Sequence, residues 1–399
     1  MTDVAKLAGV SHQTVSRVLN DHPNVREQTR MRVQAAINEL GYRPNRAARV
    51  LATGTSQVIG VVSRSSTLYG PAATLSALAE AAVQRGFTVN VESVRTLDRQ
   101  PIADAISRHL DQRVAGLVII APVQSANDAL DHLPRDIPLV SIDGDPERPT
   151  ELVTVDQEAG AYAATRHLLE AGHPTVWHVS GPDDWFDARG RLAGWRRALT
   201  EAGAEIPPLM SADWFAASGY RYGQILARMT DATAVFAAND HLALGILRAL
   251  HERGRRVPQD VSVVGFDDVP EAAYYIPPLT TIRPDFDAVA AASLDLLLAQ
   301  ITSGQRLGDR RVLTPTLISR DSVAPPRSLP RNLLDLAVAF HGGHDLGDRV
   351  VERHAVLLRA VTVAERDRAR GHVVVSGEQH EGNLLPLRVA DLLLHPVVA

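Results

Sequence analysis

The stretch DVAKLAGVSHQTVSRVLN, residues 3–20, has the pattern of two short helices joined by a tight turn. Gly9 is suited to the turn because glycine adopts left-handed backbone conformations at no steric cost. Ser11 is a favoured residue for capping the start of the second helix, and Val15 and Val18 fall on one side of that helix. The segment therefore predicts a helix–turn–helix pair whose apolar side faces a small core.

A third helix is expected immediately downstream. Val33, Ile37 and Leu40 lie at i, i+4 and i+7, and Gly41 ends the pattern. Two short helices about a turn, supported by a third, form a helix-turn-helix domain, whose second helix lies in the major groove of DNA. The competing interpretation is a three-helix cap with a structural role only.

The second helix carries side chains that can recognise bases. His12 and Gln13 begin it, and Arg17 follows one turn later. Glutamine pairs with adenine and arginine with guanine, each through two hydrogen bonds. The DNA-binding residues predicted around this helix are His12, Gln13, Arg17, Ser11, Thr14, Ser16 and Asn20.

The next segment, YRPNRAARVLATG at residues 42–54, predicts a short hinge helix. A helix of about nine residues is marginal in isolation, so we expect it to fold on binding DNA. Leu51 has no evident core around it and is suited to wedge between base steps in the minor groove. The alternative is an ordinary linker whose leucine packs locally. The DNA contacts predicted here are Asn45, Arg46, Ala48 and Leu51.

Charge supports a nucleic-acid partner for the N-terminal part only. Residues 1–55 contain eight basic and four acidic side chains, whereas the whole chain carries −5. A basic head on an acidic remainder favours a polyanion partner, although an excess this small also arises by chance.

Composition excludes several classes of protein. The 399 residues are 45% hydrophobic and 22% charged, which is enough for two to three folded domains. The absence of cysteine excludes disulfides, thiolate metal sites and cysteine nucleophiles. The chain has no run of 18 apolar residues and no secretory signal pattern at its N-terminus, so we expect a cytoplasmic protein without a membrane partner.

From residue 56 onward, strand-like runs alternate with helical patterns, which predicts an α/β core with parallel sheets. We expect strands at 58–62, 87–91, 116–121, 138–143, 176–180, 234–237 and 261–266, and helices at 71–85, 101–112, 156–171, 188–202, 218–229 and 240–253. A final helix at 285–303 and one strand near 312–319 would cross back. Ligands of such sheets bind at the carboxyl ends of the strands.

Polar and aromatic residues follow several of these strands. Carboxylates and amides bind pairs of sugar hydroxyls, arginine donates two bonds in a fixed fork, and aromatic rings cover apolar sugar faces. Taken singly, Asn-Asp and Asp-Asp after a strand are also common helix caps. The residues in question are Asp143, Arg191, Asn239, Asp240, Asp267, Asp268, Trp214 and Phe286.

Six motifs in order make residues 1–324 resemble the lac repressor (LacI/GalR) family of transcriptional regulators. They are DVAKLAGVSHQTVSRVLN, YRPNRAARVLA, ARGRLAGW, AANDHLALG, VSVVGFDD and YIPPLTTIRPDF. The family's first helix follows several further residues, so the sequence leaves open whether translation starts upstream of Met1.

The resemblance implies an all-α head with a hinge helix, followed by a periplasmic-binding-protein-like core of two doubly wound lobes connected by three crossings. The implied domains are 1–44 for the helix-turn-helix, 45–55 for the hinge and linker, and 56–324 for the core. The N-lobe covers about 56–155 and 287–315, and the C-lobe about 156–286 and 316–324, leaving 325–399 as an unassigned, poorly ordered tail.

The resemblance also implies a sugar-sized effector site between the lobes. Asp187 stands where the family pattern has serine and Pro284 where it has glutamine, so the preferred sugar can differ from a simple galactoside. The effector-binding residues carried over by motif, together with this departure, are Leu68, Gly70, Pro71, Asp143, Asp187, Arg191, Trp214, Asn239, Asp267 and Phe286.

Together with the resemblance, these patterns predict a homodimeric repressor that binds a pseudo-palindromic operator, and the resemblance implies release by a galactoside-like sugar. We expect no enzyme activity, cofactor or metal, because no phosphate-binding loop, HExxH or GxSxG motif is present. The alternatives are a repressor with a corepressor or another effector, and a stand-alone sugar-binding protein. The tail shows no leucine heptads of the kind that would make a tetramer.

Overall fold

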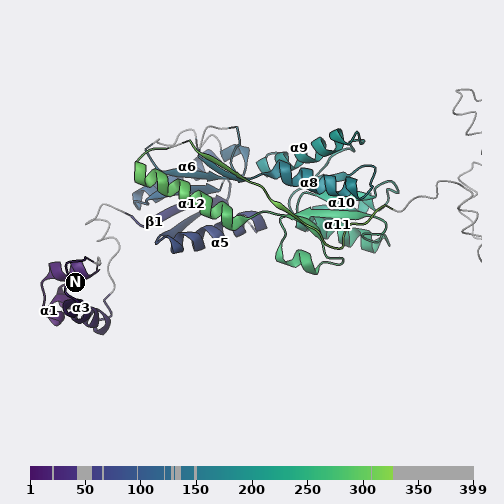
Figure 1. Cartoon of the computed structure of the whole chain (residues 1–399). Coiled ribbons are helices and arrows are strands. Elements are labelled where there is room, and N and C mark those ends of the chain that lie inside the picture. Colours follow the sequence, from purple (N-terminus) through teal and green to yellow (C-terminus); the bar gives the residue numbers. More distant parts are fainter. Residues whose placement is uncertain are drawn as a thin grey trace, which may run out of the picture. The chain divides into compact units, whose positions relative to one another are not determined.

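The computed structural model describes a small helical head and a two-sheet α/β core (Figure 1). The described residues are 1–19, 22–42, 56–64, 67–96, 98–120, 122–126, 130, 136–147, 151–306 and 308–326. The predicted fold class is confirmed. The predicted hinge at 45–55 and the tail from 327 lie outside the described residues.

The head contains the three predicted helices, α1 (Thr2–Ala8), α2 (His12–Leu19) and α3 (Glu27–Glu39). Gly9 ends α1 with φ 65°, a left-handed conformation that favours glycine. One buried cluster in the head includes Val4, Val15, Val18, Val33 and Ile37. Burial of these side chains holds three helices together that are individually too short to be stable. The expectation that Leu40 joins this apolar side was wrong: Leu40 lies just past the end of α3 and is 46% exposed.

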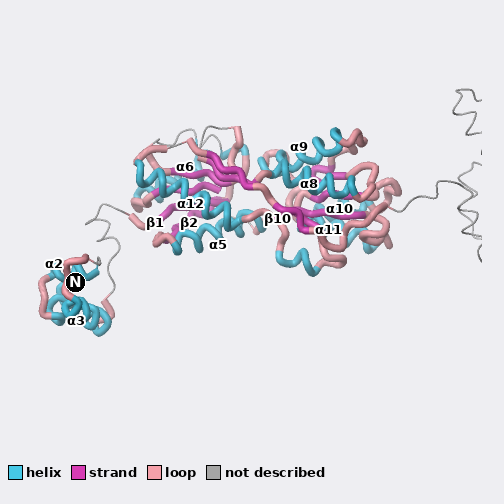
Figure 2. The backbone as a smooth tube through the Cα atoms, viewed as in Figure 1, coloured by secondary structure: helices cyan, strands magenta, loops and turns pink. Residues whose placement is uncertain are grey.

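The first sheet of the core is parallel throughout and has the strand order β11-β5-β4-β3-β1-β2 (Figure 2). Its strands are β1 (Val58–Arg64), β2 (Thr88–Val94), β3 (Gly116–Ile120), β4 (Leu139–Ile142), β5 (Leu152–Val155) and β11 (Arg310–Leu313). Helices α5 (Tyr69–Gln84) and α12 (Phe286–Ser303) pack together on one face, while α6 (Arg99–Asp111) packs on the other (Figure 1). We call this sheet with its helices the first lobe.

The second sheet has the order β12-β10-β9-β8-β6-β7 and is parallel except for the antiparallel pair β10–β12. Its strands are β6 (Trp177–Ser180), β7 (Met210–Ser211), β8 (Ala234–Ala237), β9 (Ser262–Phe266), β10 (Thr280–Arg283) and β12 (Thr316–Ile318). Helices α8 (Gln157–Glu170) and α9 (Phe186–Glu201) cover one face, and α10 (Ala216–Leu226) and α11 (Asp240–Glu252) the other (Figure 1). We call this sheet with its helices the second lobe.

The chain passes three times between the lobes, after β5, after β10 and after β11. The expectation of a single strand near 312–319 was wrong. This segment forms two strands, β11 and β12, which lie in different sheets and are separated by Thr314 and Pro315. Proline has no backbone N–H and fixes its φ, which interrupts a strand at the point where the chain changes sheet.

Three strands escaped the sequence analysis: β5, β7 and β10. The β10 segment, TTIR, is rich in threonine and lacks a continuous apolar run, although Thr280 and Thr281 are fully buried. Their hydroxyls donate to Arg320 O and Asp240 Oδ1, which makes polar side chains compatible with a central strand. Strand β7 is only two residues long, which is below the length that a pattern can reveal.

Helix α12 is long and apolar enough to span a membrane by length and composition, with a mean hydropathy of 1.3 over 18 residues. In the structure, however, it packs against α5 and the first sheet. Leu294, Leu296 and Leu297 are buried in that contact. A core helix accounts for the same composition.

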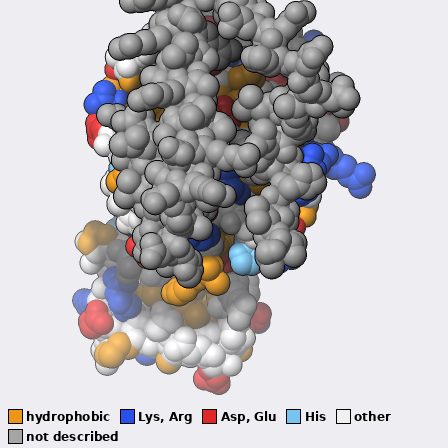
Figure 3. All heavy atoms as spheres, turned by 90° about the vertical axis from the view of Figure 1, so that its right-hand side faces the viewer, with side chains coloured by type: hydrophobic (Ala, Val, Ile, Leu, Met, Phe, Trp, Pro, Cys, Tyr) orange, Lys and Arg blue, Asp and Glu red, His pale blue; other side chains and the backbone are white. Residues whose placement is uncertain are grey.

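On the face shown in Figure 3, both basic and acidic side chains appear among the described atoms. Exposed apolar side chains also occur, and the most exposed of them are Ile276 at 94% and Tyr274 at 84%, both in the second lobe.

Candidate functional site

Helix α2 separates its apolar and polar side chains as predicted. Val15 and Val18 are buried against the head's core, whereas Gln13 and Arg17 are exposed. Ser11 starts the helix, because its hydroxyl oxygen accepts from the backbone N–H of Thr14 at 3.1 Å. The exposed face therefore presents one amide and one guanidinium on a rigid helix, the groups that discriminate bases in the major groove.

The predicted DNA-binding residues differ in how far the structure describes them. Ser11, His12, Gln13 and Arg17 are exposed, and Thr14 and Ser16 are half-buried. Asn20, Asn45, Arg46, Ala48 and Leu51 lie outside the described residues. DNA contact by each of these side chains remains a prediction.

The second candidate site lies where the two lobes meet, at the carboxyl ends of their strands. Asp143 directly follows β4, Asn239 follows β8 and Asp267 directly follows β9. Asp143 and Asp267 have φ of 54° and 100°, in the left-handed region that most side chains avoid. Unusual backbone at two acidic residues in a cleft is typical of a functional site.

A small cavity, which we call the inner cavity, lies at this junction and has a volume of about 30 Å³. A cavity of this volume has room for about two water molecules. Every predicted effector residue lines it except Asp143 and Phe286. The lining residues are Leu68, Tyr69, Gly70 and Pro71 from the first lobe and Trp185, Asp187, Arg191, Trp214, Asn239 and Asp267 from the second.

Arg191 is the central charged group of the cavity and is only 5% exposed. Its Nη2 donates to Asp267 at 3.2 Å, its Nε to Gln157 at 2.9 Å, and its Nη1 to the carbonyl of Ala238. The guanidinium also lies 3.7 Å from the ring centroid of Phe266. A planar donor held on several sides is preorganised to present its remaining N–H groups in a fixed direction.

Three carboxyl groups surround this single guanidinium: Asp143, Asp187 and Asp267. Burial raises the pKa of Asp143 to about 6, against hydrogen bonds from Thr154 and the backbone that lower it. Burial and the charge of Asp143 raise the pKa of Asp187 well above its usual range. The pKa of Asp267 is also raised by burial, against the opposing charge of Arg191. Because Asp187 is buried and shares one arginine with two other acids, it keeps its proton to higher pH than a surface acid does.

Asn239 caps the start of α11 and also lines the inner cavity. Its side-chain oxygen accepts from the backbone N–H of Leu242 at 2.8 Å, and its amide nitrogen donates to the carbonyl of Trp214 at 3.1 Å. The Trp214 ring packs directly on Gly181, where a Cβ atom would lie 2.3 Å from the ring. Asp240 has a structural role: its carboxylate is buried in the core and accepts hydrogen bonds from Val269 N and Thr281 Oγ1.

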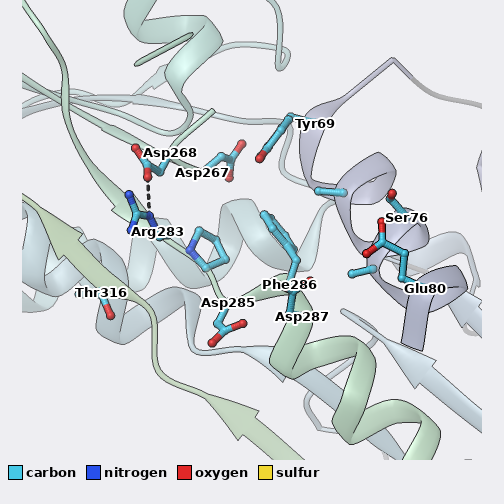
Figure 4. A pocket seen from close by; sticks show the side chains of 13 residues that line it. Tyr69, Ser76, Glu80, Asp267, Asp268, Arg283, Asp285, Phe286, Asp287 and Thr316 are labelled. Carbon is cyan, nitrogen blue, oxygen red and sulfur yellow. Dashed lines mark hydrogen bonds and ion pairs between the residues drawn. The ribbon is translucent and has the colours of Figure 1, made fainter. Parts of the chain in front are cut away.

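Phe286 lines a neighbouring, larger cavity of about 640 Å³ in place of the inner one (Figure 4). Its ring meets Tyr69 edge to face, with centroids 5.9 Å apart. Tyr69 and Asp267 line both cavities, and Figure 4 shows the Tyr69 hydroxyl directed toward Asp267. Asp268 is structural here, since its carboxylate accepts from Arg283 and Arg320.

Comparisons with known proteins show the family and the fold of the chain. Residues 1–45 match the family of bacterial regulatory proteins named after LacI, and residues 165–323 match a periplasmic-binding-protein-like domain. The chain is 38% identical over 346 residues to the lactose operon repressor of Escherichia coli strain K12, covering 84% of this chain and 95% of that protein. The chain belongs to the LacI family.

Other members are similar over the same length. The PurR transcriptional repressor of Erwinia tasmaniensis is 36% identical over 333 residues, covering 81% of this chain and 96% of that repressor. The crystal structure of the lac repressor dimer bound to operator and the anti-inducer ONPF superposes with a TM-score of 0.74 at 37% identity, covering 81% of this chain and 98% of that chain. This LacI-family chain is thus a DNA-binding transcriptional repressor, and the relatives named here are repressors and not enzymes.

Three residues of the cleft in this LacI-family chain, Tyr69, Trp185 and Gln157, are absent from the expected effector residues. Trp185 lines the inner cavity, and its ring meets Trp214 edge to face at 5.4 Å between centroids. Gln157 orients Arg191. Trp185 follows the turn after β6. Other site residues were predicted from such positions, so this position could have indicated that Trp185 lines the cleft. Gln157 is a helix-start residue whose role depends on a contact 34 positions away in the chain.

Proposed function

We propose that this repressor acts as a cytoplasmic homodimer on a pseudo-palindromic operator of a sugar-utilisation operon. We further propose that a galactoside-like sugar binds at the inner cavity and releases the protein from DNA. The site residues named above would serve these two steps.

One observation carries the sugar assignment. Arg191 and Asp267 form a buried pair, and Asn239 and Trp214 lie beside them on the wall of the same cavity. A guanidinium, a carboxylate and an amide offer donors and acceptors for neighbouring hydroxyl groups, while the indole covers an apolar ring face. That combination suits a polyol better than a purely apolar or a strongly charged ligand.

The position of the cavity supports allosteric release. Leu68 to Pro71 come from the first lobe, whereas Arg191 and Asp267 come from the second. A ligand that touches both lobes favours one arrangement of the lobes over the other. By linkage, an effector that lowers operator affinity 100-fold must bind the released state about 2.7 kcal/mol more favourably than the DNA-bound state.

Dimerisation is assigned to the core, since a head of about 40 residues is too small for an interface of about 800 Å² per partner. The core offers exposed apolar side chains in both lobes. Val83 on α5 is 67% exposed, and Tyr274 and Ile276 are more exposed still. Two paired heads then place two α2 helices in successive major grooves, and two hinge segments over the operator centre.

An electrophoretic mobility-shift assay tests the proposal. The full-length protein is mixed with DNA flanking its own gene, with and without methyl β-galactoside, lactose or a purine base. We expect a specific complex that a galactoside dissociates. A complex that strengthens with a purine would replace the inducer by a corepressor, and the absence of a specific complex would contradict operator binding.

A further inference from the structure

Two carboxyl groups from different lobes meet in the cleft. Asp143 directly follows β4 in the first lobe, and Asp187 lies in the first turn of α9 in the second lobe. The charge of Asp143 raises the pKa of Asp187, so the two groups interact across the junction of the lobes. We call Asp143 and Asp187 the cleft pair. Two carboxylates that share a buried site repel each other, so the ionisation of this pair affects how the lobes fit together.

The members of the cleft pair differ in their partners. The Asp143 carboxylate accepts a hydrogen bond from the Thr154 hydroxyl of its own lobe at 3.2 Å. Asp187 lines the inner cavity and has no hydrogen bond or ion pair to any residue that the structure describes. Hydrogen bonds to a carboxylate favour its charged form, and Asp187 lacks them. The proton of the pair is therefore assigned to Asp187.

Arg191 does not supply the missing donor. Its Nη2 donates to Asp267, and its Nε and Nη1 donate to Gln157 and to the carbonyl of Ala238, all within the second lobe. Arg191 and Asp267 neutralise each other as an ion pair. The charge of this wall of the cleft thus depends on Asp187: the wall is neutral when Asp187 holds its proton and negative when the proton is lost.

Other charged or titratable side chains near the pair come from β1, α5 and α11. Arg64, at the end of β1, lies over the ring of Trp185, which lines the same cavity. Tyr69, on α5, also lines it, and burial raises the pKa of its phenol, so this group is neutral at pH 5 to 8. His241, on α11, lowers the pKa of Asp267 by its charge. Since histidines change charge near neutral pH, a test must separate His241 from the cleft pair.

We propose that the cleft pair is a pH-sensitive switch between the lobes, in which a proton on Asp187 favours closure of the cleft and loss of that proton favours its opening. With the proton bound, Asp143 faces a neutral wall that contains Arg191. Without the proton, Asp143 faces a second negative charge. Protons then regulate the repressor in addition to its effector. This switch goes beyond the proposed function and does not depend on which ligand the cleft binds.

The direction and size of the effect follow from linkage. The pKa of Asp143 is about 6 in this arrangement of the lobes, and that of an exposed aspartate is about 3.9. A proton therefore favours this arrangement, and the contribution is lost as pH rises through about 6. For Asp143 alone, the preference for closure falls about tenfold between pH 5 and pH 8. Asp187, whose pKa is raised well above its usual range, adds to the fall and extends it to higher pH.

Fluorescence energy transfer between the lobes tests the switch. The chain has no cysteine, so dyes attach only where cysteine is introduced. Ala103→Cys on α6 and Ala193→Cys on α9 provide one exposed position on each lobe (Figure 1). Labelled full-length protein is diluted into an excess of unlabelled protein, so that energy transfer is measured within one chain. Without any ligand, we expect the transfer to change between pH 5 and pH 8, with a midpoint above pH 6.

Three variants identify the groups responsible. Asp187→Ser removes the unpaired acid and keeps a small polar side chain; we expect the midpoint to move about one pH unit lower. Adding Asp143→Asn to this variant should abolish the change. Asp183→Asn is the matched control, because Asp183 is an exposed acid in the turn before α9, and it should behave like the parent. Circular dichroism at each pH verifies that every variant is folded.

Three results would overturn the switch. Constant energy transfer in the parent would show that the lobes do not respond to pH. An unchanged midpoint in Asp187→Ser would show that Asp187 is not the responsible group. A change that persists in the double variant would assign the response to His241 or to surface charges. None of these results bears on the proposed function, because the measurement contains neither operator nor sugar, and the mobility-shift assay tests that function separately.

Discussion

The two lobes of the core share an architecture yet contribute differently to the cleft. Each has a six-stranded sheet covered by helices on both faces. The second lobe supplies all the ionisable side chains of the inner cavity apart from the Tyr69 phenol, including Arg191, Asp187 and Asp267. The first lobe supplies a short wall, Leu68 to Pro71, at the start of α5.

This difference separates two tasks that one ligand must perform. Under the proposed function, directional hydrogen bonds from the second lobe decide which ligand binds, because a mismatched buried polar group costs about 1–3 kcal/mol. Apolar contact with the first-lobe wall has little directionality, so under the proposed function it depends on whether the cleft is occupied and little on which ligand occupies it. We therefore expect changes in the second lobe to alter affinity, and changes in the wall to alter the response.

The largest expected effect is that of Arg191→Ala in the second lobe. The change removes the donor to Asp267 and to the sugar, at a cost of about 1.5–3 kcal/mol in effector binding. The variant should bind operator but resist release by a galactoside, which titration and the mobility-shift assay would measure. Arg196→Ala on the exposed side of the same helix is the control. An Arg191→Ala protein that titrates like the parent would show that the cavity is misassigned.

A substitution in the head should change DNA binding without changing effector binding by the lobes. Arg17→Ala should cost about 1–3 kcal/mol of specific binding and relax the preference at one base position, because a bidentate base contact is lost. Binding to random DNA and to the sugar should barely change. Fluorescence anisotropy on operator and scrambled duplexes measures the difference, and equal losses on the two would argue against base recognition by Arg17.

The wall should affect response more than affinity. Leu68→Ala removes apolar contact from the first lobe while leaving the polar groups of the second lobe in place. We expect effector affinity to fall less than threefold, and the operator affinity at saturating effector to remain severalfold higher than in the parent. If affinity falls strongly and the response is unchanged, the division of tasks between the lobes is wrong.

The acidic cluster predicts a pH dependence of stability. The pKa of Asp143 is about 6 in the folded protein and about 3.9 in the unfolded chain. Its contribution to the free energy of unfolding is therefore fully present below the unfolded pKa and is lost as pH rises through the folded pKa of about 6. Asp187, with its pKa also raised, acts in the same direction. Asp187→Asn should therefore lose less thermal stability than the parent between pH 5 and pH 8.

Thermal unfolding at the two pH values measures this change. A difference of about 1 kcal/mol would appear as about 2–4 °C in Tm. Asp183→Asn is the control, because Asp183 is an exposed acid in the preceding turn. Parallel loss in Asp187→Asn and the parent would show that Asp187 is ionised in the folded protein.

The smallest effect is expected from removing residues 328–399. Close to the end of the described residues, the Ala324 N–H donates to Ser262 Oγ in the second lobe at 3.0 Å, so the truncation keeps this contact. Dimerisation, operator binding and release should be unchanged in the truncated protein. Sedimentation decides the matter, since a tetramer that became a dimer on truncation would assign assembly to the tail.

The sequence predicted the fold well because its strongest patterns are local. The helices of the head and the buried strands such as β3 and β9 follow from short apolar periodicities. The pairing of Arg191 with Gln157, and the break at Pro315 that sends β11 and β12 to different sheets, depend on contacts between distant segments. Asp143, Asn239 and Asp267 were expected at one site because carboxyl ends of parallel strands converge, whereas Leu68, Gly70, Pro71 and Asp187 were expected only from the family resemblance. Trp185 was missed because a tryptophan after a turn is equally compatible with a core position.

The small size of the inner cavity has a consequence for the speed of induction. A space of about 30 Å³ cannot admit a pyranose ring until the surrounding side chains or lobes separate. Under the proposed function, association of the sugar proceeds in two stages, an opening followed by capture, and the observed rate reaches a plateau as sugar concentration rises. Above the concentration at which the plateau is reached, the rate of opening sets the delay between the arrival of sugar and the start of transcription.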